Sequence, residues 1–295
     1  MKRSVILDFD QSVGAVQSAQ VIDLREQRDA IRFGCGMRRM RELRVQLDSQ
    51  LPPDYGTVFL GSGDFHHVSW PLIERLAPRG PFQVVVLDNH PDNMRFPFGV
   101  HCGSWVRRVA LLPFVSHVHV LGITSPDISR ASIWENYLEP LRCGKLSYWC
   151  TDVDTRWTRS ALGRALNLDR AFRRFDSIAD MVSCFGDEIH RASQDTYLSI
   201  DKDVLSSEVA HTNWDQGRMR EDEMMAIIDL LAGRIIGSDI TGDVSIHRYR
   251  QWWKRKLSAL DAQPDIAPNE ISEWQAQQHA LNVRLLERIT QASGI

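Results

Sequence analysis

One stretch of the chain decides the fold: Val84-Val85-Val86-Leu87-Asp88-Asn89-His90-Pro91-Asp92. Its apolar first part predicts a strand that is buried on both faces, as is typical of a parallel sheet covered by helices. Polar side chains follow at once, and in open parallel sheets ligands bind beyond the carboxyl ends of the strands. We therefore expect Asp88, His90 and Asp92 to lie at a functional edge of the sheet.

Strand-like and helix-like segments alternate along most of the chain. The other strand candidates are residues 5–9, 57–60, 117–121, 145–149, 196–200 and 234–236. Apolar residues at three- and four-residue intervals predict helices at residues 23–47, 70–76, 104–112, 129–137, 160–166, 178–191 and 221–231. This alternation predicts an α/β fold with a mostly parallel sheet covered on both sides.

The C-terminal part of the chain differs in composition. Residues 249–256 are basic and aromatic and predict a helix, which two prolines after residue 262 would end. A last helix is expected up to Gln291, with Asn269 as a candidate cap. We expect a catalytic domain over residues 1–245 and a helical extension, residues 246–295, packed on the same domain.

The adjacent Trp252 and Trp253 allow two interpretations. The favoured one is that they anchor their helix to the core or to a second subunit, which makes a homo-oligomer a candidate state. The alternative is stacking on nucleic acid or contact with a membrane.

Composition limits the partners and the compartment. A net charge of −3 and a pI near 6.4 give no reason to expect nucleic acid as a partner. No apolar run is long enough to cross a bilayer, so no membrane partner is expected. The five cysteines form no CxxC pair, which favours reduced thiols and a cytoplasmic location over disulfides or structural zinc.

Polar clusters follow the predicted strands. They are Gly61-Ser62-Gly63-Asp64-Phe65-His66-His67, Asp88-Asn89-His90-Pro91-Asp92, Gly99-Val100-His101-Cys102-Gly103, Ser199-Ile200-Asp201-Lys202-Asp203 and Gly237-Ser238-Asp239-Ile240-Thr241-Gly242-Asp243. Carboxylates neutralise divalent cations, and imidazole fills a ligand position without adding charge. Helix capping would explain one of these acids but not two matched clusters. The pattern indicates a pair of divalent metals and a metal-dependent hydrolase.

The order of these clusters resembles the ureohydrolase superfamily, which includes arginase, agmatinase and formimidoylglutamase. Those enzymes carry GGDHS, DAHxD, a GNxHG-like histidine, SxDxD and a DIxE-type segment in the same order. The resemblance runs from residue 57 to residue 243. It implies the arginase-type three-layer α/β/α sandwich and two divalent metal ions, with Mn²⁺ as the expected identity.

The resemblance also implies a set of metal ligands, two of them bridging. Asp88 and Asp201 would bridge the metals, and the remaining ligands would be His66, Asp92, His90 and Asp203. Two cations a few ångströms apart lower the pKa of a bridging water, so that hydroxide forms at neutral pH and attacks an sp² carbon. An extra residue separates Asp64 from the histidine relative to GGDHS, so the ligand is His66 or His67, with His66 favoured.

Catalysis is assigned to Asp92 and His101. His101 is similar to the family's proton-relaying histidine, and it would protonate the departing amine. A histidine at the start of a helix can also serve only as a hydrogen-bonding group, and this alternative stays open.

Departures from the family pattern concern the substrate. Gly242 stands where arginase-like enzymes carry the glutamate that binds the guanidinium, and Asp243 is the neighbouring acid. The loop after Asp203 lacks the family's Asp-Pro and Thr-Gly features, and contains Asn213 and Asp215. We expect Asp243, Asn213 and Asp215 to contact the substrate. That substrate would be a small molecule or a modified peptide with a guanidino, amidino or amide C–N bond.

Three alternatives remain at this point. The adjacent His66 and His67 resemble the histidine dyad of single-zinc deacetylases. The N-terminal strand ending in Asp8 and Asp10 resembles the first motif of haloacid-dehalogenase-type phosphatases, in which Asp8 would be the nucleophile. The altered segment at Gly242 is compatible with a protein that binds metals or a ligand without catalysis.

Overall fold

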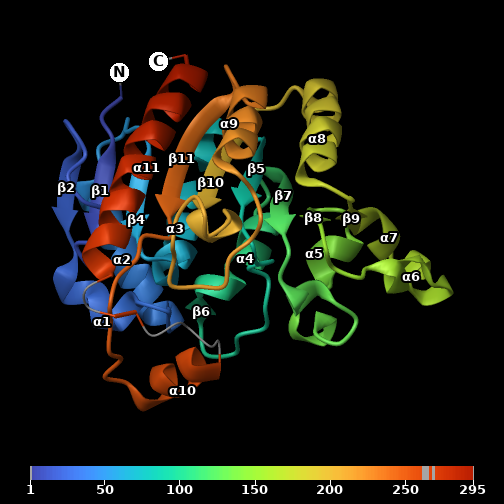
Figure 1. The fold of residues 1–295 in the computed structure, drawn as a ribbon, viewed down its shortest axis with the longest axis horizontal. Helices are drawn as coiled ribbons and strands as arrows, with labels where there is room; N and C mark the ends of the chain where they lie inside the picture. Colours follow the sequence, from blue (N-terminus) through green and yellow to red (C-terminus); the bar gives the residue numbers. More distant parts are fainter. Residues whose placement is uncertain (1, 261–265, 268–269, 295) are drawn as a thin grey trace.

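The computed structural model describes residues 2–260, 266–267 and 270–294 and is built around one large sheet (Figure 1). Its strands are β1 (Val5–Asp8), β2 (Gln20–Asp23), β4 (Val58–Gly61), β5 (Phe82–Leu87), β7 (Val115–Ile123), β8 (Leu146–Cys150), β9 (Phe172–Arg174), β10 (Thr196–Asp201) and β11 (Ile235–Thr241). They are ordered β2-β1-β4-β11-β10-β5-β7-β8-β9, and each pairs with its neighbours in parallel. A separate antiparallel pair joins β3 (Gly34–Cys35) to β6 (Val100–His101).

Alternate side chains of each central strand enter two different apolar cores. In β5, Val84 and Val86 belong to one core, whereas Val85 and Leu87 belong to the other. The first core is covered by α2 (Met37–Gln50), α3 (Ser69–Glu74) and α4 (Val106–Ala110), and the second by α8 (Ile178–Ala192), α9 (Glu221–Leu230) and α11 (Ile271–Ala292). Helices therefore cover both faces, and the predicted three-layer α/β/α sandwich is confirmed.

Shorter helices complete the chain: α1 (Arg28–Ile31), α5 (Glu139–Arg142), α6 (Ala161–Ala165), α7 (Leu168–Ala171) and α10 (Trp252–Leu260). In Figure 1, α10 lies beyond the tips of the strand arrows, at the carboxyl edge of the sheet. There the Lys254 ammonium donates to the carbonyls of Asp29, Ala30 and Arg32 at 2.9, 3.2 and 2.7 Å. No helix in the described part of the chain is both long and apolar enough to span a membrane.

Two of the expected helices are wrong. Residues 23–47 hold the end of β2, a 3₁₀ turn, α1, β3 and the start of α2. The break falls at Phe33, whose φ of 67° is incompatible with a continuous right-handed helix. Residues 129–137 contain only the 3₁₀ turn Ile133–Glu135. The predicted cap Asn269 lies outside the described residues, and the division at residue 245 stays a prediction.

Candidate metal centre

Neighbouring strands bring the predicted ligands to one point. The strands β5 and β10 are paired so that Leu87 lies opposite Ile200, which places Asp88 and Asp201 side by side at the carboxyl edge. The strand β4 lies two positions from β10 in the sheet, and it runs into the 3₁₀ turn Gly63–Val68, which carries His66. The parallel register thus assembles residues that are far apart in the sequence.

A first group of ligand atoms surrounds the Nδ1 atom of His66. This atom lies 3.2 Å from Asp88 Oδ2, 2.9 Å from Asp92 Oδ2 and 3.4 Å from Asp201 Oδ2. On the other side of the ring, His66 Nε2 is 3.0 Å from the Ser199 hydroxyl. An outer hydrogen bond of this kind orients an imidazole ligand toward a metal.

A second group surrounds His90, and Asp88 is common to both groups. His90 Nδ1 lies 3.0 Å from Asp203 Oδ2 and 3.6 Å from Asp88 Oδ1, while His90 Nε2 lies 2.8 Å from Asp215 Oδ1. Ligand atoms within each of the sets His66–Asp88–Asp201 and Asp88–His90–Asp203 are within 4.8 Å of one another. Two adjacent sets sharing one carboxylate are the arrangement that a pair of cations requires.

The buried carboxylates repel one another unless positive charge is present. Burial and the nearby Asp88 raise the pKa of Asp92 to about 7 and that of Asp203 to about 7. Burial and Asp203 also raise the pKa of Asp201. Burial opposes protonation of His66, but the carboxylates of Asp88 and Asp92 outweigh it and raise the His66 pKa. Hard oxygen donors with two imidazoles fit divalent cations such as Mn²⁺, which would supply the missing charge.

The centre opens into a cavity of about 620 Å³. Of the other predicted site residues, His101 and Asp215 line it. His101 Nδ1 accepts from the Gly103 backbone N–H at 3.0 Å and caps the 3₁₀ turn that begins there. Burial lowers the pKa of His101 to about 4, so the ring is neutral at pH 7.

The structure does not bring Asp243 or Asn213 to the cavity lining. Asp243 is fully buried, and its Oδ1 accepts from Lys202 Nζ at 2.6 Å and from Asn282 Nδ2 at 2.9 Å. Asn213 makes two hydrogen bonds with the backbone of Ser245, at 3.0 and 2.8 Å. Both side chains are hydrogen-bonded to other parts of the protein, and neither lines the cavity.

Several residues at the site carry no recognisable signal in the sequence. Trp105 is fully buried and donates its indole N–H to Asp92 Oδ2 at 2.6 Å. Phe33 lines the cavity, and so does Trp214, which stands between Asn213 and Asp215 in the loop that we expected to form the substrate pocket. Ser199, which contacts His66 Nε2, could have been predicted from the sequence because it is the serine of the SxDxD pattern. Its hydroxyl also lies 2.8 Å from Asp239 Oδ1.

The two alternative enzyme classes, the single-zinc deacetylases and the haloacid-dehalogenase-type phosphatases, each require a residue that does not line the cavity. His67 is fully buried and is not part of the lining, so only one histidine of the adjacent pair faces the carboxylates. Asp8 is also not part of the lining, and its Oδ1 accepts from the Gln11 backbone N–H at 2.8 Å. This geometry favours neither a deacetylase dyad nor an aspartyl nucleophile.

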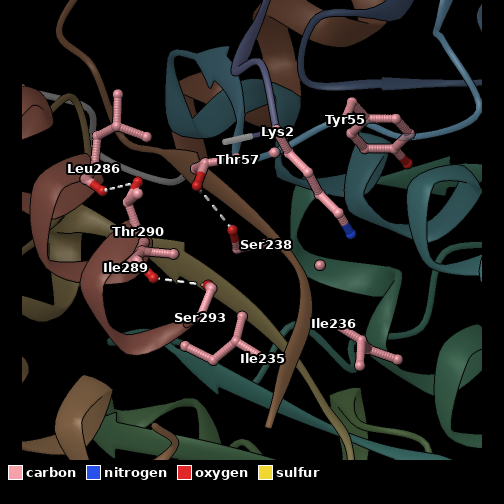
Figure 2. A pocket seen from close by; sticks show the side chains of 12 residues that line it. Lys2, Tyr55, Thr57, Ile235, Ile236, Ser238, Leu286, Ile289, Thr290 and Ser293 are labelled. Atoms are coloured by element: carbon pink, nitrogen blue, oxygen red, sulfur yellow. Dashed lines mark hydrogen bonds between the residues drawn. The ribbon is translucent and has the colours of Figure 1, made fainter. Parts of the chain in front are cut away.

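A smaller hollow of about 40 Å³ lies at the opposite edge of the sheet, where β4 and β11 begin (Figure 2). The hydroxyls of Thr57 and Ser238 bond each other at 3.0 Å, and those of Thr290 and Ser293 bond carbonyls of α11. Its volume is close to that of one water molecule. We therefore assign no chemistry to this hollow.

Comparisons with known proteins agree with the fold. No family model matches the sequence. An uncharacterized protein of Thermotoga maritima is 27% identical over 221 residues, which cover 74% of this chain and 71% of that protein. Arginase from Bacillus caldovelox superimposes with a TM-score of 0.56 at 13% identity, covering 98% of each chain. Proclavaminate amidino hydrolase from Streptomyces clavuligerus gives 0.55 at 13% identity, covering 99% of this chain and 93% of its own. The chain therefore has the fold of the ureohydrolase superfamily.

Proposed function

We propose that the protein is a metal-dependent hydrolase that cleaves a C–N bond of a guanidino or amidino compound at a pair of divalent cations, with Mn²⁺ as the expected metal. The observation that carries this proposal is the shared carboxylate of Asp88, which lies between the His66 and His90 groups. The names of similar structures, an arginase and an amidino hydrolase, favour this class of substrate over a simple amide. A small-molecule substrate in a reducing, cytoplasmic compartment remains part of the proposal, as does self-association.

The ligand residues hold and orient the reactive centre. Asp88 and Asp201 would supply negative charge that holds the cations, and Asp92 is fixed by the indole of Trp105. Bound there, the cations would supply a water of lowered pKa and polarise the carbon that it attacks. The Ser199 hydroxyl and the Asp215 carboxylate keep the Nδ1 atoms of the two histidines turned toward the centre.

His101 is the residue that we propose for assisting proton transfer to the leaving nitrogen. Because its Nδ1 accepts from the Gly103 backbone, the neutral ring carries its proton on Nε2. Such an N–H can donate a hydrogen bond to the leaving nitrogen, which takes up the proton released by the attacking water, so the ring stays neutral throughout. The low pKa keeps the ring uncharged, which prevents repulsion of nearby cations.

Metal content tests the proposal. Protein purified without chelator and reconstituted with Mn²⁺, Zn²⁺ or Mg²⁺ should hold about two Mn²⁺ per chain by elemental analysis, as a binuclear site requires. Asp88→Ala should lose both ions and all turnover, because one carboxylate serves both groups. Asp154→Ala, at an exposed ion pair with Arg156, is the matched control and should keep both.

Other metal contents would point to other chemistry. One tightly held Zn²⁺ per chain would contradict the binuclear centre and favour a single-zinc deacetylase. Retention of two ions in the Asp88→Ala variant would refute the ligand assignment. If the protein holds two ions but turns over no guanidine or amidine in a broad screen, the result would favour a metal-binding protein without catalytic activity.

A further inference from the structure

One side of the cavity is aromatic. Phe33, Phe96, His101 and Trp214 all line it, and we call these four residues the aromatic wall. Phe33 is nearly parallel to His101, at 11° and a ring-centroid distance of 5.9 Å, and to Trp214, at 13° and 6.4 Å. Phe96 meets the edge of His101 at 4.5 Å. The wall is thus continuous from one ring to the next.

Trp214 places this wall beside the metal ligands. Its ring centroid is 6.0 Å from that of His90. It also lies against Gly63, where an added Cβ would be 3.1 Å from the Trp214 ring and 3.1 Å from Asp201 Oδ2. A molecule whose reacting carbon lies at the metal centre will therefore contact the indole with the atoms next to that carbon.

The wall is separate from the two cores that stabilise the sheet. Phe33, Cys102 and Tyr249 form a small apolar cluster of their own, against which Trp214 and Trp253 pack. Phe33 adopts a φ of 67°, a left-handed conformation that is unfavourable for a non-glycine residue and clusters at functional sites. Tyr249 holds the Phe33 ring edge-on at 5.9 Å, and α10 brings Trp253 to within 6.3 Å of Phe96.

The positions expected to bind a guanidinium, 242 and 243, provide no carboxylate to the cavity lining. Gly242 has no side chain, and the Asp243 carboxylate is bound to Lys202 and Asn282. Polar lining comes instead from Arg95, Asp127, Glu135 and Asp215. The Asp215 carboxylate is bound to His90 Nε2 at 2.8 Å and to Asn89 Nδ2 at 3.3 Å, so the groups left to recognise atoms next to the reacting bond are the ring faces.

We propose that the substrate carries an aromatic or heteroaromatic group directly adjoining the C–N bond that is cleaved, and that this group packs on Phe33 and Trp214. This inference rests on the proposed function, since it takes the metal centre as the place where the bond is cut. It makes Trp214 a specificity-determining residue, because its ring lies 6.0 Å from that of His90, beside the proposed metal ligands.

Two hydroxamic acids test the inference by binding rather than turnover. Hydroxamates chelate metal pairs through the same two oxygen atoms, whatever group they carry. We expect benzohydroxamate to bind the Mn²⁺-loaded protein at least about tenfold more tightly than acetohydroxamate by calorimetry, as stacking and burial of one ring predict. Trp214→Leu should reduce this preference to about threefold or less while leaving acetohydroxamate binding unchanged.

Controls separate the possible failures. Trp134→Leu, at an exposed tryptophan outside the cavity lining, should keep the full preference. Phe33→Leu provides a second wall variant if Trp214→Leu fails to fold. Equal binding of the two hydroxamates by the unmodified protein, or a preference that survives both wall variants, would overturn the inference and leave the metal centre intact. Binding of neither hydroxamate would refute the proposed function and the inference with it.

Discussion

The ion pair between Lys202 and Asp243 provides the sharpest test of how this site is built. Both side chains are fully buried, and Lys202 Nζ lies 2.6 Å from Asp243 Oδ1. Asn282 of α11 bonds to both, at 2.8 and 2.9 Å. Since Lys202 stands between the proposed ligands Asp201 and Asp203, the ion pair holds the turn that carries them to the C-terminal helix.

Replacing one partner leaves the other charge buried and unpaired. Asp243→Asn should therefore cost about 3–5 kcal/mol of unfolding free energy, as do other broken buried pairs. At about 2–4 °C per kcal/mol for a chain of this size, Tm should fall by on the order of 10 °C. The double variant Lys202→Met with Asp243→Asn should recover most of that loss, because no charge is then left buried.

The assay is thermal and urea unfolding of protein kept in chelator, so that metal binding does not contribute. Glu74→Gln, at the partly exposed pair with Arg44, is the control and should change stability by about 0–1 kcal/mol. If Asp243 contacts the substrate, as we expected from the sequence, Asp243→Asn would instead raise KM and leave Tm unchanged. That result, or single-variant losses that simply add in the double variant, would refute the structural role.

Three further expectations concern the metal centre. His101→Asn keeps a good helix cap and should leave metal content unchanged while lowering kcat; an unchanged kcat would remove His101 from proton transfer. Asp215→Asn should weaken Mn²⁺ binding about 10–100-fold in competition titrations, because it removes the carboxylate that orients His90; unchanged affinity would contradict this role. Burial and Asp88 raise the pKa of Asp92 and Asp203 from 3.8 to about 7, so the metal-free fold is stabilised by protons that are lost as pH rises through 7. The rise in Tm on adding Mn²⁺ should therefore grow between about pH 5.5 and about pH 8, and a constant rise would refute the assignment of these pKa values.

The central strands were predictable because their apolar runs are long and buried on both faces. The edge strands β2 and β9 were not, since each is only partly buried; Val21 in β2, for example, is 60% exposed. The helix expected over residues 23–47 failed for a different reason. Its apolar spacing is continuous, but the turn at Phe33 is stabilised by contacts with Tyr249 and His101, which are distant in the sequence.

Within the site, the sequence was informative wherever the ligand follows directly from a strand end. Asp88 and Asp201 are placed by the register of β5 and β10, which their apolar runs already predict. The partners that come from far along the chain were not predictable. Neither the engagement of Asp243 by Lys202 and Asn282 nor the position of Trp214 leaves any local pattern, because each depends on how α11 and the loop after β10 pack.

The glycine at position 242 and the buried Lys202 are physically linked. Gly242 has a φ of 91°, and a Cβ there would lie 2.6 Å from Asp201 Oδ1 and 2.7 Å from the Lys202 backbone nitrogen. A side chain at this position would displace Asp201, which we propose as a metal ligand, so glycine is required here. With the backbone turned in this way, the next carboxylate, that of Asp243, faces inward, and a buried cation from the neighbouring strand end must neutralise it. Gly242 therefore links the two parts of the site: it leaves room for Asp201, and its backbone turns Asp243 inward to the ion pair with Lys202.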